Sequence, residues 1–409
     1  MTHPSRVGEP FLFWLRADLF LLLGLVTTAA LGGREVRAQS TTSLDIEIVY
    51  LERKAEHPPT LSNFDRVPED EGLQGARLGI EDSSATGKFL KHNYILEEHV
   101  AKTSQDLLAI ARTALGGGPK IAILNVPAAD LLAIADLPGV ADGLIFNVGD
   151  ADVELRSDAC RKNVLHTLPS RDMLSDALMQ FLVKRQWTDI LLVTGRYPTD
   201  RAFGAALKIS AKKFGVTIAA EKPWLEDADI RRNAMQEVPV FTQDSDYDVV
   251  VVADEEDQFG AFLQYNTWQP RPVMGSAGLT AAGWSPAMEQ WAAIQLQERF
   301  RALAKRPMNS IDYAAWLAAR TVAEAVTRTK SADMATIRSY IFSDRFALDG
   351  FKGSRLSYRT WNGQLRQPIP LAGERALVTL APIEGFLHQK TELDTLGLDE
   401  PESKCRAME

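Results

Sequence analysis

Residues 172–194, DMLSDALMQFLVKRQWTDILLVT, place a helix-like stretch directly before a strand-like one. In the first part, apolar residues recur with the 3.6-residue period of a helix. In the second part, 190–194, they run together without polar alternation. An unbroken apolar run of this length is typical of a strand buried on both faces of a parallel sheet. The stretch therefore predicts one unit of an α/β fold.

The same alternation extends along the chain. Further strand-like runs are found at 46–51, 121–126, 144–148 and 249–253. Helical periodicity returns at 202–214, where Gly215 ends the helix, and at 310–329. The helix over 310–329 is expected to bury Tyr313, Trp316, Leu317 and Val326. Two sets of such units, separated by a crossing near 165–170, predict two lobes.

Two local features follow the second set. Ser285 followed by Pro286 has the form of a helix cap and first turn, so a helix is expected from this point. Its inward positions would be Met288, Trp291, Ile294 and Leu303. The Asn-Gly pair inside 361–364 predicts a β-hairpin.

The N-terminus resembles an export signal. Arg6 and Arg16 flank or precede an apolar stretch, 19–31, that is short for a membrane span. The small residues around Ala38 predict cleavage after it, which gives a signal peptide over 1–38. An uncleaved N-terminal anchor is the alternative. Export would place the mature chain in the periplasm.

Composition excludes several classes of function. A net charge of −9 argues against nucleic-acid binding, which needs a basic face. Two cysteines and six histidines give no zinc-like cluster, and no cofactor is predicted. Cys160 and Cys405 could form one disulfide in an oxidising compartment or remain two thiols. The chain lacks a Gly-x-Gly-x-x-Gly turn after its first strand, a Gly-x-Ser-x-Gly elbow and a phosphate-cradling loop, so we expect no enzyme.

The order of segments resembles the type I periplasmic binding proteins, the group that includes the leucine/isoleucine/valine binders. The resemblance covers most of the chain after residue 43. It includes 72–79 as the first helix, Leu168-Pro169-Ser170 at the crossing, 313–316, the turn at 348–353 and the Arg366-Gln367-Pro368-Ile369 strand. It implies two Rossmann-like lobes with parallel central sheets joined by a three-crossing hinge.

A narrower resemblance concerns the region after the second set of strands. Its residues are Trp284, Glu289, Gln290, Gln295, Leu296, Arg299 and Phe300. They are similar to a branch of ABC-transporter binding proteins associated with pyrroloquinoline-quinone-dependent alcohol oxidation. The resemblance implies the same association for this chain.

The sequence departs from amino-acid binders of this type at two places. Those relatives hold the ligand carboxylate with a Ser/Thr-rich loop after a first-lobe strand, whereas residues 125–129 here are Asn-Val-Pro-Ala-Ala. They hold the ligand ammonium with an acidic residue on a second-lobe loop, and the matching loop, 275–278, has none. An amino-acid ligand is therefore not expected.

The candidate site consists of residues that follow the strands, because open α/β sheets bind ligands beyond the carboxyl ends of their strands. The candidate ligand-binding residues are Glu52, Asn147, Asp150, Arg196, Tyr197, Asp254, Glu255 and Ser276. If their loops face one another, the carboxylates favour a cationic or polyhydroxylated ligand. Acidic residues after strands can also be helix caps, and the aromatic residue can be a packing residue.

The resemblance predicts domains with these boundaries: 44–168 plus 281–343 for lobe 1, 169–280 plus 344–385 for lobe 2 and the hinge strands, and 386–409 for a C-terminal tail. It implies a monomer that captures a small-molecule ligand between the lobes and delivers it to an ABC transporter permease. Two alternatives remain, a periplasmic sensor or accessory protein with the same two lobes and an unrecognised hydrolase. A neighbouring permease would favour transport, and a neighbouring receptor kinase would favour sensing.

Overall fold

The computed structural model describes residues 43–61, 67–225, 230–243 and 246–408. The predicted signal peptide over 1–38 lies outside the described residues. Within the described ranges, no helix is both long enough and apolar enough to cross a bilayer.

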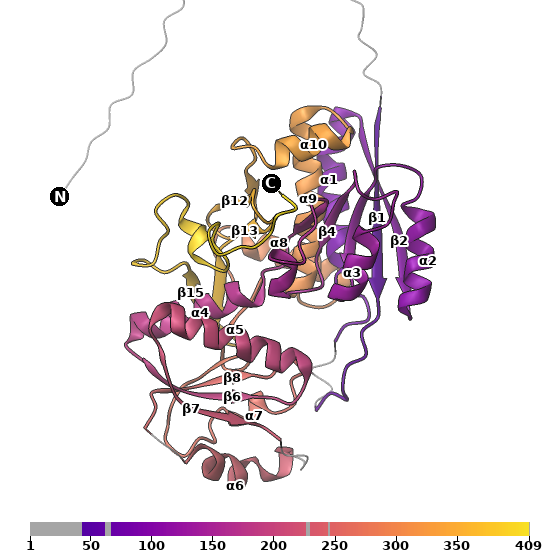
Figure 1. Cartoon of the computed structure of the whole chain (residues 1–409). Helices are drawn as coiled ribbons and strands as arrows, with labels where there is room; N and C mark the ends of the chain where they lie inside the picture. The colour runs from indigo at the N-terminus through magenta and orange to yellow at the C-terminus, as the bar shows by residue number, and fades with distance from the viewer. Residues whose placement is uncertain (1–42, 62–66, 226–229, 244–245, 409) are drawn as a thin grey trace, which may run out of the picture. The chain divides into compact units, whose positions relative to one another are not determined.

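The first lobe is built on a five-stranded parallel sheet in the order β2-β1-β3-β4-β5. Strands β1, β2 and β4 of this sheet are labelled in Figure 1. Its strands are β1 (Leu44–Arg53), β2 (His92–Ala101), β3 (Ile121–Asn125), β4 (Leu144–Asn147) and β5 (Val164–His166). The predicted runs at 46–51, 121–126 and 144–148 are thereby confirmed as strands.

Both faces of this sheet are covered. Along β1, Ile48 and Tyr50 pack into one core, whereas Val49 and Leu51 pack into another. The first core contains helices α1 (Leu73–Leu90) and α9 (Ser310–Thr329), and the second contains α2 (Ser104–Ala114) and α3 (Ala128–Ala135). Successive side chains of a strand point to opposite faces, so burial on both faces requires the unbroken apolar run seen in the sequence.

The second lobe is built on a seven-stranded sheet in the order β15-β14-β10-β9-β8-β6-β7. The strands are β6 (Asp189–Thr194), β7 (Thr217–Pro223), β8 (Val249–Ala253), β9 (Val273–Gly275), β10 (Leu279–Ala281), β14 (Ile369–Ala372) and β15 (Leu377–Ala381). All neighbours pair in parallel except at β14, which is antiparallel to both β10 and β15. Helices α4 (Arg171–Arg185) and α5 (Pro198–Phe214) cover one face, and α6 (Ile230–Thr242) and α7 (Gly260–Leu263) cover the other (Figure 1).

The remaining elements are one short helix of the first lobe and the segments around α9 and toward the C-terminus. They are η1 (Val153–Arg156), α8 (Ala293–Ala304), α10 (Met334–Ile341), β11 (Leu348–Asp349), β12 (Arg355–Tyr358), β13 (Leu365–Arg366) and η2 (Glu392–Thr395). Strands β12 and β13 pair antiparallel across the Asn-Gly turn, as predicted. Side chains of β11, β12 and β13 join the core around α9, whereas β14 and β15 join the second sheet.

The prediction of a helix from Ser285 is wrong, because α8 begins only at Ala293. The hydroxyl of Ser285 accepts from the amide of Ala287, 3.2 Å away, and so stabilises a turn rather than a helix cap. The backbone of Trp291 has a φ of 53°, which lies in the left-handed region and interrupts a right-handed helix. The later start also changes the buried face: Leu296 and Phe300 are buried, whereas three of the four residues predicted to point inward are exposed, namely Trp291, Ile294 and Leu303.

A buried polar network joins the crossings between the sheets. Arg156 is fully buried and donates to the Gln364 side chain at 3.0 Å and to the Leu168 carbonyl at 3.0 Å. Gln367 donates to the Thr167 carbonyl at 2.7 Å. These bonds tie residues of the first crossing to the segment that leads into β14.

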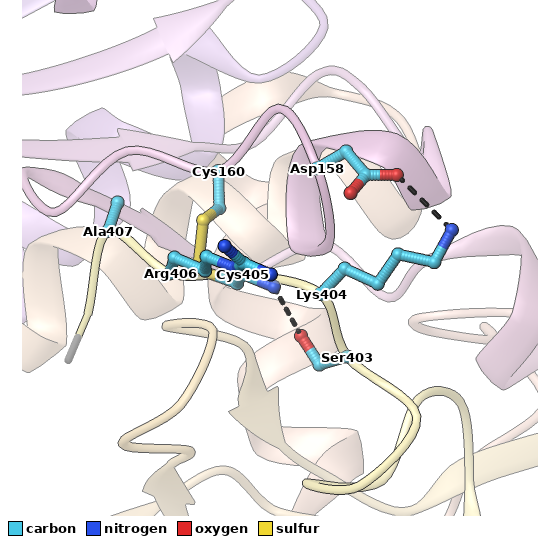
Figure 2. Close-up of a pocket in the computed structure, with 7 residues that line it drawn as sticks. All are labelled: Asp158, Cys160, Ser403, Lys404, Cys405, Arg406 and Ala407. Atoms are coloured by element: carbon cyan, nitrogen blue, oxygen red, sulfur yellow. Dashed lines mark hydrogen bonds and ion pairs between the residues drawn. A yellow bond between two sulfur atoms is a disulfide. The ribbon is translucent and has the colours of Figure 1, made fainter.

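A disulfide joins Cys160 to Cys405, with the two Cα atoms 5.5 Å apart (Figure 2). Of the two arrangements left open by the sequence, the paired one is present. Beside the disulfide, the hydroxyl of Ser403 donates to the Arg156 carbonyl at 3.0 Å. Earlier in the tail, the amide of Gly397 donates to Asp176 of α4 at 2.8 Å. The tail therefore contacts both the second lobe and the first.

Candidate functional site

A cavity of about 680 Å³ lies where the carboxyl ends of the strands of the first sheet meet the second lobe. From the first lobe, it is lined by residues that end or follow β1, β3 and β4, including Glu52, Asn125 and Asp150. From the second lobe, it is lined by Arg171 at the start of α4, Thr199 in the first turn of α5, and Glu256 after β8. This is the position where open parallel sheets bind ligands. We call this cavity the cleft.

Beneath the cleft lies a hydrogen-bonded group around the buried Tyr50, whose partners Glu52 and Asn125 line the cavity. Its hydroxyl donates to Glu52 at 3.1 Å, and the side-chain amide of Asn125 donates to the Tyr50 hydroxyl at 3.3 Å. Asn125 also donates to the Glu71 carbonyl at 3.1 Å. Burial and the neighbouring Glu52 carboxylate raise the pKa of Tyr50 well above its usual value, so the phenol keeps its proton. The side-chain amide of Asn125, which lines the cleft, is therefore already hydrogen-bonded within the protein to the buried phenol and to a backbone carbonyl.

Glu71 lines the cleft beside this group in a part-buried position. Burial, followed by the charge of Asp312, raises the pKa of its carboxyl from 4.5 to about 7. The side-chain amide of Asn309 donates to one Glu71 oxygen at 2.5 Å, which opposes the rise. Glu71 is therefore the cleft carboxyl that changes charge near neutral pH.

The wall from the second lobe contains an Arg–Glu pair. Arg171 donates to both carboxylate oxygens of Glu255, at distances of 2.7 to 3.0 Å. Burial raises the pKa of Glu255, and the adjacent guanidinium opposes that rise. Two-point geometry of this kind fixes both side chains, so the guanidinium is committed to a carboxylate of the chain itself.

A segment of the first lobe crosses the cleft to the second. His57 Nδ1 lies 3.3 Å from a Glu256 oxygen, and the other Glu256 oxygen accepts from the Thr199 hydroxyl at 2.9 Å. Farther along, Arg231 of α6 donates to the Leu61 carbonyl at 3.1 Å. The two lobes are therefore in contact through the loop that follows β1.

The predicted site residues divide into two groups. Glu52 and Asp150 line the cleft, and Glu255 holds the Arg171 that lines it. Asn147 is fully buried beneath them, where it receives a bond from the Asp150 amide at 3.1 Å and donates to the Asp150 carbonyl at 2.8 Å. Asn147 thus shapes the loop that carries Asp150.

The other predicted residues do not line the cleft. Arg196 borders a separate pocket of about 540 Å³, and its guanidinium carbon lies 5.5 Å from the centre of the Tyr197 ring. Asp254 accepts from three successive backbone amides, at 2.6 to 2.9 Å, around the start of α7. Ser276 accepts from the Asp254 amide at 2.8 Å. In this structure, Asp254 and Ser276 hold a loop.

Several residues that line the cleft were not among the predicted site residues. They are His57, Glu71, Asn125, Arg171, Thr199 and Glu256. Arg171 and Glu256 could have been found, since one begins the helix after the crossing and the other follows Glu255 directly. His57 and Glu71 lie between β1 and α1, where no periodic pattern marks them.

Residues 68–266 match the sequence model of a family described as "Periplasmic binding protein". No curated protein matches the chain. Among solved structures, a branched-chain amino acid ABC transporter periplasmic ligand-binding protein from Burkholderia xenovorans is similar, with a TM-score of 0.66 and 15% identity over 89% of this chain and 100% of that one.

Two ligand complexes have the same fold. An ABC transporter substrate-binding protein from Desulfitobacterium hafniense in complex with Leu gives a TM-score of 0.61 at 14% identity, over 82% of this chain and 99% of that one. A solute-binding protein from R. palustris in complex with benzoate gives 0.62 at 12% identity, over 88% of this chain and 99% of that one. At these identities the likeness establishes the fold, which agrees with the two-lobed α/β architecture predicted from the sequence.

Proposed function

Because residues 68–266 match the periplasmic binding protein family and the fold is shared with solved binding proteins, we propose that the chain is a type I periplasmic binding protein that captures a small solute between its two lobes in the periplasm. The observation that carries the proposal is the cleft. It is lined from both lobes, and its volume of about 680 Å³ suits a metabolite-sized ligand. Similar proteins hold Leu and benzoate, which are molecules of that size.

Capture follows from the two-lobed layout. A ligand that contacts residues of both lobes binds the closed arrangement better than the open one, and so shifts the population toward closure. Three crossings act as the hinge: one near 167–170, one near 278–285, and one between β13 and β14, since β11 to β13 pack in the core of the first lobe and β14 joins the second sheet. Support comes from the polar network around Arg156, which ties the first crossing to the segment that leads into β14.

The closed form presents surfaces of both lobes to a membrane permease of the ABC type, which receives the solute. The N-terminal export signal predicted from the sequence supports the periplasmic location. The chain acts as a monomer, and its function is binding and delivery rather than catalysis.

We further propose that transport serves pyrroloquinoline-quinone-dependent alcohol oxidation. The support is the resemblance of the segment from Trp284 to Phe300 to the branch of binding proteins that is associated with this oxidation. Trp284 is buried against Tyr313, with ring centres 4.5 Å apart, and Arg299 pairs with Asp82 at 3.1 Å, so these residues act in packing rather than in ligand contact. Deleting the gene should impair growth on an alcohol but not on the corresponding acid. Equal growth of the deletion strain on both would contradict the link.

A ligand screen tests the capture function. A solute that binds only the folded chain stabilises it and so raises its melting temperature. At a solute concentration a hundred times the Kd, the stabilisation is about 2.7 kcal/mol. Native mass spectrometry of the freshly isolated protein should detect a bound solute carried through purification. The proposal fails if a broad library of periplasmic metabolites produces no thermal shift and no adduct.

A further inference from the structure

We infer that the cleft takes a small organic cation, such as a protonated amine, that carries no carboxylate. The inference rests on the proposed function and concerns the charge of the ligand. A ligand carboxylate would need a helix N-terminus or a cationic side chain to bind to. At the N-terminus of α3 and at the cationic side chains of the cleft, a carboxylate of the chain itself is already bound.

The first such group is the N-terminus of α3, which follows β3 at the edge of the cleft. Free backbone amides at a helix N-terminus attract anions. Here the amide of Ala128 donates to the Asp150 carboxylate at 2.7 Å, and the other Asp150 oxygen accepts from the amide of Asp152 at 2.7 Å. Asp150 thus occupies the position where a ligand carboxylate would meet the end of the helix.

The second group is the set of cationic side chains. Among the described residues lining the cleft, three are lysine or arginine, and each is paired with a carboxylate of the chain. Arg53 pairs with Asp130, Lys54 with Glu52 at 2.6 Å, and Arg171 with Glu255 at 2.7 Å. A ligand carboxylate would have to displace one of these pairs and leave a part-buried carboxylate without its partner, which is costly.

The third observation is the balance of charge. The described lining contains six carboxyl groups against the three cations, with His57 in addition. The six are Glu52, Glu56, Glu69, Glu71, Asp150 and Glu256. An excess of one sign in a recessed site raises the local concentration of ions of the opposite sign. The cleft therefore repels an anion and attracts a cation.

Matched pairs of probes that differ in charge test the inference. We choose benzylamine against benzoate and 3-methylbutylamine against leucine, and measure binding by calorimetry at pH 7.5. The wild-type protein should bind each amine at least about tenfold more tightly than its carboxylate counterpart, which corresponds to about 1.4 kcal/mol.

Substitution of Asp150 tests its role directly. Asp150→Ala frees the two amides and removes a negative charge, so benzoate should gain affinity and benzylamine should lose it. Asp150→Asn removes the charge but keeps a hydrogen-bond acceptor for the amides. It should therefore reduce the preference for amine over carboxylate less than Asp150→Ala does. Asp158→Ala is the matched control, because Asp158 lies on the surface beside the disulfide and pairs with Lys404 (Figure 2).

The outcomes separate the inference from the proposed function. An amine preference that narrows in Asp150→Ala and persists in Asp158→Ala supports the inference. Tighter binding of benzoate or leucine by the wild type overturns the inference and leaves solute capture standing. If none of the four probes binds, the inference that the cleft takes a small organic cation is also overturned. The metabolite screen then decides separately whether the chain captures a solute.

Discussion

Replacing both Cys160 and Cys405 with serine should destabilise the protein strongly. The disulfide closes a loop with a sequence separation of 245 residues, and the chain-entropy relation for a loop of that length gives about 5.5 kcal/mol at 25 °C. The folded state should change little, because the Ser403 hydroxyl still donates to the Arg156 carbonyl and the Lys404 amide to the Ser157 hydroxyl. The loss therefore arises from the greater freedom of the unfolded chain.

Urea unfolding measures this loss. The wild type and the double serine variant are compared without reductant, and the wild type is compared again with dithiothreitol, which should reproduce the variant. Thiol titration of the denatured, unreduced wild type should find no reactive cysteine. A difference below about 1 kcal/mol, or two titratable thiols in the wild type, would refute the reasoning, since the loop would then impose no constraint.

Three further changes probe the interior. Arg156→Met leaves the Asp152 carbonyl and the buried Gln364 side-chain oxygen without their donor, while the Asp150 and Leu168 carbonyls keep one other donor each. It should cost more than about 2 kcal/mol in urea unfolding, and a loss under about 1 kcal/mol would show that the network is dispensable. Between pH 4.5 and about 7, Glu71 keeps its proton in the folded chain while the unfolded chain releases it. The free energy of unfolding should therefore fall as the pH rises through this window, by up to about 1.4 kcal/mol per pH unit. Glu71→Gln should flatten this slope, and an unchanged slope would contradict the assignment. A Cβ at Gly75 would lie 1.9 Å from the Asp312 carbonyl oxygen, so the Gly75→Ala variant should unfold at a markedly lower temperature than the wild type. A Cβ at Gly373 would have no atom within 4 Å, so the Gly373→Ala variant should melt like the wild type. Equal melting temperatures of the two variants would contradict close packing at Gly75.

The strands could be predicted from the sequence because burial on both faces leaves a strong signal. The run at 249–253 is apolar throughout, and all of its residues are buried, as β8. The helix predicted over 310–329 is confirmed to the residue, since Asn309 caps it by accepting from the Asp312 amide at 3.0 Å. This helix could be predicted because it is 20 residues long and keeps its helical period of apolar residues throughout.

The start of α8 could not be predicted in the same way. Ser285 and Pro286 satisfy the local rule for a helix start, but the ring of the preceding Trp284 stacks on Tyr313, and Met288 is buried in the core. These long-range contacts favour a turn, and a local pattern contains no information about them.

The sequence pointed to part of the lining of the cleft, and the site itself stays a prediction. The rule that ligands bind beyond the carboxyl ends of parallel strands identified Glu52 and Asp150 at the cleft. It did not distinguish strand ends that face the cleft from one that borders another pocket, as at Arg196. It also missed His57, because the loop after β1 reaches the second lobe through contacts that no periodicity reports.

The central claim is that the lobes close on a ligand held between them, and the distance between the far edges of the two sheets tests it most directly. Lys102 follows the edge strand β2 and Leu225 follows the edge strand β7, and both are exposed. The chain's own two cysteines are joined, so spin labels on Lys102→Cys and Leu225→Cys are specific. With the compound that gives the largest thermal shift, the inter-label distance distribution should move to a shorter and narrower peak. A distribution that is unchanged at saturation would contradict closure around the ligand.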